Sequence, residues 1–151
     1  MARLTAFLKK PLADQRLLVF AALLHVLVAL AVRVLPFGLV QRALGRVAAM
    51  GPGGPWIDDD ARVVRAVRTV ASLLPGATCL TEALVAQCLL ARQSSKTTLC
   101  FGVSRVTPAE RPFDAHAWLE RRGAIVIGAS AIAYDSLHSR HNRCGFSAFP
   151  R

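Results

Sequence analysis

The stretch FDAHAWLERRGAIVIGAS, residues 113–130, decides the fold that the sequence predicts. Polar and apolar side chains alternate over Asp114–Arg121, and Ala124–Ser130 is a second short run of strand-forming residues. Arg122-Gly123 lies between the two runs and predicts a tight turn. Upstream, Lys96–Arg105 is rich in β-branched and aromatic residues and predicts another strand. We therefore expect a small antiparallel sheet of about three strands.

The part of the chain before this sheet is predicted to be helical. Apolar residues recur at helical spacing in four segments, which proline and glycine separate. In the last of the four, the apolar residues repeat on one face. The segments are Leu17–Val32, the stretch after Pro36 to about Met50, the stretch from Asp58–Asp60 to Pro75, and the stretch from Thr78 or Cys79 to about Gln93. The fold class that follows is α+β.

No Gly/Ser-rich linker divides the chain, so we expect one domain over residues 1–151. It would consist of a helical N-terminal part (1–75), a core that carries one more helix and the sheet (76–131), and a C-terminal tail (132–151). The tail has no clear periodicity.

Leu17–Val32 is the most apolar segment of the chain, and it contains His25 and ends at Arg33. A membrane-spanning helix needs about 20 residues, and this run has 16. We favour a buried core helix. Association with or insertion into a membrane is one alternative, and a signal peptide is another because basic residues precede the run.

The chain carries a net charge of +10, most of it from arginine, and 54% of its residues are hydrophobic. Arginine can serve simply as the default surface residue of a GC-rich genome. No helix-turn-helix, zinc spacing or RNP-like aromatic set is present, so we predict no nucleic-acid partner. An acidic peptide, an acidic protein or the inner membrane surface would also suit this charge.

The four cysteines are Cys79, Cys88, Cys100 and Cys144. None of them forms a CxxC pair, so a structural zinc site is not expected. Their spacing is wide and the chain is not Cys-dense, which favours reduced thiols and a cytoplasmic location.

Cys79 and His116 are the candidate catalytic residues. Cys79 lies at the start of a predicted helix, where free N–H groups and partial positive charge favour a thiolate and supply donors for an oxyanion. His116 lies in a strand, on the face that also carries Asp114 and Trp118. We expect this face to be accessible and the opposite, apolar face to pack against helices. Taken singly, a cysteine is more often a small buried apolar residue and a histidine a structural one. The order of a cysteine at a helix start, a strand, and a histidine on the next strand is that of papain-like and transglutaminase-like cysteine enzymes.

The residues around both positions resemble those of one family. CLTEALVAQCLL, residues 79–90, resembles the Cys-Leu-x-x-Ala-Leu helix of the lasso peptide biosynthesis B proteins. CFGVSR (100–105) followed by FDAHAWLERRGAIVIG (113–128) resembles their Gly-Val strand and Phe-x-Ala-His-Ala-Trp hairpin. These leader peptidases are similar to the C-terminal domain of the microcin J25-processing protein, within the transglutaminase-like cysteine protease superfamily. The resemblance covers residues 79 to about 130, and the apolar helix followed by Leu35-Pro36-Phe37 also resembles the family's N-terminal part.

The resemblance implies a papain/transglutaminase-like core and a bacterial cysteine endopeptidase. Such an enzyme removes the leader from a ribosomally made lasso peptide precursor, before an asparagine-synthetase-like cyclase closes the ring. Cys79 would be the nucleophile and His116 the base, and neither a cofactor nor a metal is implied. The first 78 residues are predicted to be helices only, so we find none of the winged-helix-like leader-binding module of some relatives. A separate PqqD-like leader-recognition protein is then the expected partner, and the arginine-rich, apolar surface would suit either that protein or the inner membrane.

One position departs from the family pattern. In relatives that have an orienting acid, it lies about twelve residues after the histidine, where this chain has Gly128. Ser130 is near, and Asp114 shares the strand face of His116, but neither has the expected position. The third group is therefore a backbone carbonyl, Asp135 from the tail, or absent.

Gly128 and the apolar run at Leu17–Val32 also keep a second function open. In that alternative, the chain is a non-catalytic scaffold or membrane-associated protein of the same maturation complex. It would have a thiol no more reactive than a free cysteine.

Overall fold

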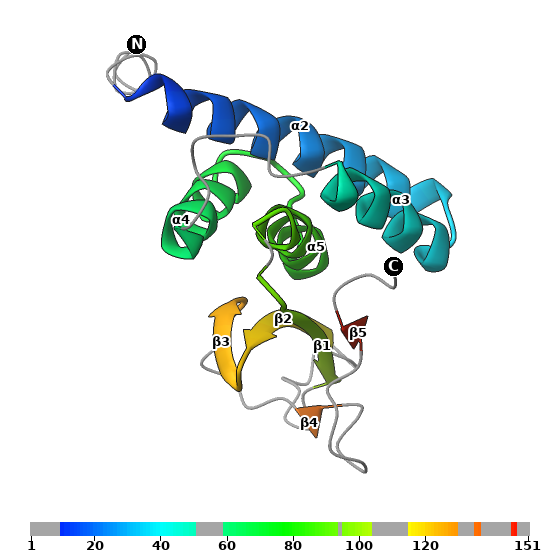
Figure 1. The fold of residues 1–151 in the computed structure, drawn as a ribbon. Helices are drawn as coiled ribbons and strands as arrows, with labels where there is room; N and C mark the ends of the chain where they lie inside the picture. The colour runs from blue at the N-terminus through cyan, green and yellow to red at the C-terminus, as the bar shows by residue number, and fades with distance from the viewer. Residues whose placement is uncertain are drawn as a thin grey trace.

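The computed structural model describes residues 10–50, 59–93, 95–103 and 115–129, and the backbone of 135–136 and 146–147. The elements are the helices α2 (Leu12–Val34), α3 (Phe37–Ala49), α4 (Asp60–Ala71) and α5 (Cys79–Ala91), and the strands β1 (Thr98–Val103), β2 (Ala115–Arg121), β3 (Ala124–Ile127), β4 (Asp135–Ser136) and β5 (Phe146–Ser147) (Figure 1). Helices precede strands along the chain, so the predicted α+β class is confirmed.

α5 lies between the other helices and the sheet (Figure 1). Every residue from Ala83 to Leu90 is buried, so α5 is enclosed on all sides, and the expectation of one apolar face was wrong. A helix that is apolar all round is stable in such a central position. The core cluster joins α5 to the sheet through Leu99, Leu119 and Ile127.

Pro36 separates α2 from α3. Leu35 is extended, with φ −114° and ψ 146°, which is the conformation that a residue before proline prefers. Pro36 then precedes the first turn of α3 with φ −57°, close to the helical value. The predicted break between the two helices is therefore confirmed.

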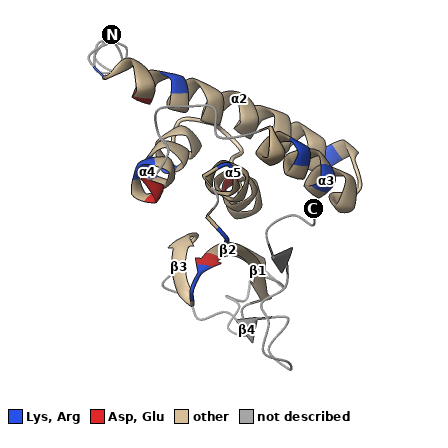
Figure 2. Ribbon diagram, viewed as in Figure 1, with Lys and Arg blue, Asp and Glu red and all other residues tan. Residues whose placement is uncertain are grey.

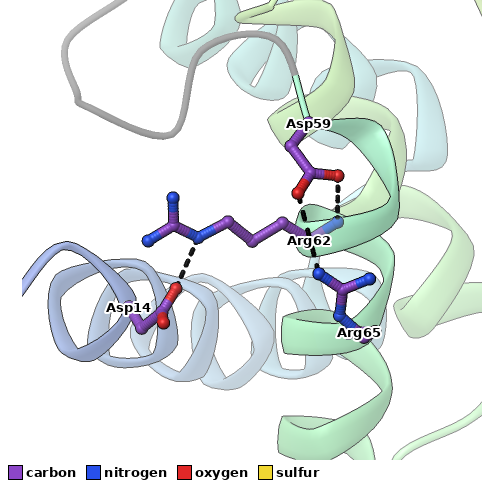
Figure 3. A network of polar contacts seen from close by, with 4 residues as sticks. All are labelled: Asp14, Asp59, Arg62 and Arg65. Carbon is purple, nitrogen blue, oxygen red and sulfur yellow. Dashed lines mark hydrogen bonds and ion pairs between the residues drawn. The ribbon is translucent and has the colours of Figure 1, made fainter. Parts of the chain in front are cut away.

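A polar network ties α2 to α4 (Figure 3). The Asp59 side chain caps α4 by accepting a hydrogen bond from the Arg62 N–H at 2.9 Å. The Arg62 guanidinium pairs with Asp14 in the first turn of α2. Arg65 also pairs with Asp59, at 3.6 Å, but both side chains are exposed, so this pair adds little stability.

Asp60 ties the start of α4 to the sheet. Its carboxylate pairs with Arg121 at the end of β2, and it accepts a hydrogen bond from the Ser95 hydroxyl at 2.9 Å. The aspartate run was predicted to begin a helix, and Asp59 and Asp60 do so. Asp58 lies outside the described residues.

The sheet has the antiparallel order β3-β2-β1, as predicted, and β4 and β5 both pair with β1. The tight turn between β2 and β3 has positive φ at Arg122 (50°) and at Gly123 (79°). Two successive positive φ values are typical of a type I′ hairpin turn. The two-residue strands of the tail were not predicted, because so short a pairing has no periodicity in sequence.

α2 is longer than the apolar run that predicted it, and it is buried on one face only. Leu17, Ala21, Leu24, His25 and Val28 are at most 5% exposed. The prediction of a core helix is confirmed for this face and wrong for the opposite one, where leucines and valines are exposed. In the described part of the chain, α2 is the one helix whose length and composition would allow it to cross a membrane.

Candidate active site

Cys79 is the first residue of α5, and Thr78 caps the helix. The Thr78 hydroxyl accepts a hydrogen bond from the Thr81 N–H at 3.2 Å, and the Thr81 hydroxyl accepts one from the Thr78 N–H at 2.9 Å. Gly76, with φ 81°, provides the turn that precedes this cap. The capping box fixes where α5 begins, and so it fixes Cys79 at the positive end of the helix dipole.

Cys79 is half-buried, whereas the other two cysteines of the described residues, Cys88 and Cys100, are buried. The Cys88 thiol donates to the Leu44 carbonyl at 3.6 Å, and burial raises its pKa to about 12. Among the described cysteines, Cys79 is thus the one accessible to a substrate. Cys144 lies outside the described residues.

His116 lies on β2 opposite Gly102 of β1, and its ring is held from β3. The His116 Nε2 atom is 2.7 Å from the carbonyl oxygen of Gly128, which directly follows β3. A carbonyl only accepts hydrogen bonds, so Nε2 carries a proton. In the neutral ring, Nδ1 is then the basic nitrogen.

Gly128 holds its carbonyl in this place with a backbone that only glycine adopts readily. Its φ is 82°, and a Cβ added there would lie 2.9 Å from the carbonyl oxygen of Ala117 and 2.9 Å from the Cβ of Trp118. Contacts of that length with backbone and a buried side chain would force the segment to shift. Position 128, where this chain has no acid, therefore supplies a main-chain acceptor, one of the alternatives that the sequence left open.

Trp118 packs against the His116 ring. The two rings stack with centroids 6.2 Å apart and planes 17° apart. The Trp118 Nε1 atom donates to the Glu120 carboxylate at 2.7 Å, which fixes the indole. Trp118 is only 8% exposed, whereas its strand face was predicted to be accessible. The opposite face, with Ala117 and Leu119, packs into the core as expected.

Glu82, in the first turn of α5, interacts electrostatically with His116. It lies three residues after Cys79, so the two share a helix face. Burial raises the pKa of Glu82, and the charges of Arg68 on α4 and His116 on β2 act in the opposite direction. Helix α5 also packs against β2. The charge of His116 therefore acts on a carboxyl that lies one helical turn after Cys79.

Sequence reasoning missed Glu82 and Arg68, although their spacing held some information. Glu82 follows Cys79 by one helical turn, which predicts a shared face, but nothing in the sequence places Arg68 there. Of the other third-group candidates, Asp114 and Ser130 lie outside the described residues, and Asp135 is described only by its backbone pairing with Val103.

The described residues contain no group of three or more His, Cys, Asp or Glu side chains placed to hold a metal ion. The candidate side chains are a thiol at a helix N-terminus, an imidazole hydrogen-bonded to a main-chain carbonyl and a half-buried carboxyl. Such groups can perform nucleophilic and acid–base chemistry.

A family model described as "Transglutaminase-like superfamily" matches residues 23–138, which is more than half of the chain. The matched range contains both α5 with Cys79 and β2 with His116. Neither the curated proteins nor the solved structures contain a significant match.

Proposed function

The chain belongs to the transglutaminase-like superfamily, and from that premise we propose that it is a cysteine peptidase that removes the leader from a lasso peptide precursor. In this proposal, Cys79 is the nucleophile and His116 is the base. The observation that carries it is the hydrogen bond between His116 Nε2 and the Gly128 carbonyl, because that bond holds the ring in the tautomer a base needs.

The reaction is acyl transfer in two steps. His116 takes the Cys79 thiol proton at Nδ1, and Sγ bonds to the carbonyl carbon of the scissile peptide. The C–N bond breaks as His116 returns the proton to the leaving amine. Water then attacks the thioester while His116 takes one of its protons, and the thiol is restored.

The start of α5 is suited to stabilise the oxyanion of this reaction. The first N–H groups of a helix have no acceptor within the helix. Here the Thr81 N–H bonds to the Thr78 hydroxyl, and the Glu82 N–H bonds to the Thr78 carbonyl. The N–H groups of Cys79 and Leu80 are then the donors that remain for the developing negative charge.

Gly128 takes the place of the acid in this mechanism. An orienting group keeps the histidine in its useful tautomer, and a main-chain carbonyl does this as well as a carboxylate. It adds no negative charge beside the ring, so it stabilises a charged imidazolium less than an acid would. We therefore treat Gly128 as a positioning residue.

The resemblance of residues 79–90 and 113–128 to the lasso peptide biosynthesis B proteins supports the leader as the substrate. The expected partners are the precursor peptide, a separate PqqD-like leader-recognition protein and an asparagine-synthetase-like cyclase. A net charge of +10 suits an acidic leader, although it suits other anionic partners equally.

Mass spectrometry of a cleavage reaction tests the function. The purified chain is mixed with the leader-recognition protein and the precursor peptide encoded beside it. Wild type is expected to give two fragments, and Cys79→Ala and His116→Ala are each expected to lower the rate by at least about 10³-fold. Cys88→Ala, the same change in the same helix, is the matched control and should keep the rate within about threefold. Cleavage by the Cys79→Ala variant at the wild-type rate would refute the mechanism. If wild type fails to cleave the precursor even when cyclase and ATP are added, the non-catalytic scaffold function replaces the peptidase function as the proposal.

The role of Gly128 is tested separately by ¹⁵N NMR of the histidine rings at alkaline pH. The His116 signal, identified by its loss in His116→Ala, should have the shifts of the Nε2–H tautomer. An Nδ1–H tautomer would contradict the positioning role, whatever the cleavage assay gives.

A further inference from the structure

α2 has a continuous line of exposed side chains along its length. The exposed residues recur every three or four positions, so they lie on one side of the helix. Seven aliphatic side chains in this line are at least half exposed, a larger apolar strip than a soluble surface usually leaves uncovered. We call these residues the α2 line, and they are Leu12, Arg16, Val19, Leu23, Val26, Leu27, Leu30, Arg33 and Val34.

The opposite face holds α2 in the protein. It contributes five buried residues to the interior, and the Asp14–Arg62 pair joins its first turn to α4 (Figure 3). To span a bilayer, α2 would have to separate from α4 and α5 and withdraw its five buried side chains from the core. The α2 line is therefore a surface of the folded chain, and a partner must meet it from outside.

The charges on the α2 line are positive only. Arg16 and Arg33 lie in it near its two ends, about 25 Å apart along the helix axis, and exposed Lys10 precedes α2 (Figure 2). Asp14 is the one acidic residue of α2, and Arg62 neutralises it on the side that faces α4. An apolar strip with a guanidinium at each end suits a layer that is apolar beneath and anionic at its surface, because arginine can lay its stem along the strip and keep its charge at the headgroups.

The composition of the strip favours lipid over a protein partner. Between Arg16 and Arg33 its side chains are all leucine and valine. Protein interfaces are anchored by aromatic residues and by hydrogen bonds that set the register, and this strip offers neither. Lipid binding needs only apolar area and attraction to anionic headgroups.

We propose that the α2 line lies flat on an anionic membrane surface and holds the folded chain there. This is independent of the peptidase reaction. α2 runs along one side of the molecule and the sheet lies on the other, with α5 between them (Figure 1). The contact therefore leaves the sheet, which includes β2 with His116, on the far side of α5 from the bilayer.

Vesicle flotation of the full chain tests the proposal. The probes are vesicles of phosphatidylcholine alone and vesicles with about one third phosphatidylglycerol. Wild type should float with the anionic vesicles and much less with the neutral ones. Leu23→Ser/Leu27→Ser/Leu30→Ser should lower the bound fraction at least about tenfold, and Arg16→Gln/Arg33→Gln should remove most of its dependence on salt.

The matched control places serine at two exposed apolar residues outside the α2 line, Leu73 and Ile125, which are 53% and 52% exposed. This variant should float like wild type, and equal melting temperatures of all variants would show that the fold is kept. Failure of wild type to float with anionic vesicles, or flotation of the triple variant like wild type, overturns the proposal. If instead wild type forms a dimer that the triple variant lacks and neither binds vesicles, the line is an interface between two copies.

Discussion

α5 carries two cysteines nine residues apart whose surroundings are opposite in kind. Cys79 begins the helix, is half-buried and shares its turn with a carboxyl that interacts with His116. Cys88 lies in the enclosed part of the same helix, donates to the Leu44 carbonyl and has a pKa raised to about 12. The first N–H groups of a helix have no acceptor within it, whereas desolvation in the interior disfavours a charged sulfur. Position along one helix thus separates a thiol suited to chemistry from a thiol used for packing.

The largest expected difference between the two cysteines is their rate of alkylation. With iodoacetamide near pH 7.5, Cys79 should react at least about 100-fold faster than Cys88, because a thiol with a pKa near 12 is almost entirely protonated. Peptide mapping by mass spectrometry measures both sites in one sample. In about 6 M guanidinium chloride the two rates should become similar. Equal rates in the folded chain would remove the distinction.

The second difference concerns stability, where the order is reversed: we expect the larger effect from replacing Cys88 and the smaller one from replacing Cys79. Cys88→Ala should lower the free energy of unfolding by about 1–2 kcal/mol, because it removes a buried sulfur and leaves a small cavity. Cys79→Ala at the half-buried helix start should change it by less than about 0.5 kcal/mol. Urea titrations of both variants supply the values, and a Cys79 variant less stable than the Cys88 variant would mean that Cys79 serves packing.

A smaller effect is expected when the cap that places Cys79 is removed. Thr78→Ala deletes the hydroxyl that accepts from the Thr81 N–H, and should cost about 1 kcal/mol. Thr69→Ala removes a hydroxyl from the last turn of α4 and is the matched control. Thermal melts of both variants give the comparison. If they are destabilised equally, the capping box does not define where α5 begins.

The smallest effect concerns Glu82. Burial raises its folded-state pKa, so between its unfolded and folded pKa values the native carboxyl keeps a proton that the unfolded chain has released. Ionisation therefore lowers stability as pH rises through the folded pKa, and the penalty is absent below the unfolded value. Glu82→Gln should raise the melting temperature at pH 7, with a gain that shrinks toward pH 4. A constant gain at both pH values would point to packing as its cause.

The sequence predicted the fold well wherever periodicity or a punctuating residue was present. The break at Pro36, the helix begun by Asp59 and the turn at Arg122-Gly123 were each readable from local chemistry. The enclosure of α5 and the exposed side of α2 could not be predicted, because the identity of an apolar residue does not show whether another element covers it. The pairing of β4 and β5 with β1 depends on contacts distant in sequence.

For the candidate site, the sequence predicted which side chains take part but not the main-chain atom or the packing around them. Cys79 and His116 follow from residue type and order, and that they form the site remains a prediction. The acceptor for His116 is a main-chain atom, so residue identity could show only that an acid was missing at 128. The charges of Arg68 and His116 act on Glu82 through the packing of α4, α5 and β2, which sequence spacing does not encode.

The Gly128 carbonyl has a consequence for how relatives of this chain are sorted into active and degenerate members. Every amino acid carries a main-chain carbonyl, so this acceptor depends on the backbone conformation at position 128 and not on a functional side chain. Only a residue that cannot keep φ near 82° would turn it away from the histidine. A search that requires an acid twelve residues after the histidine would discard this chain as inactive. A search that accepts either an acid or a glycine there would keep it.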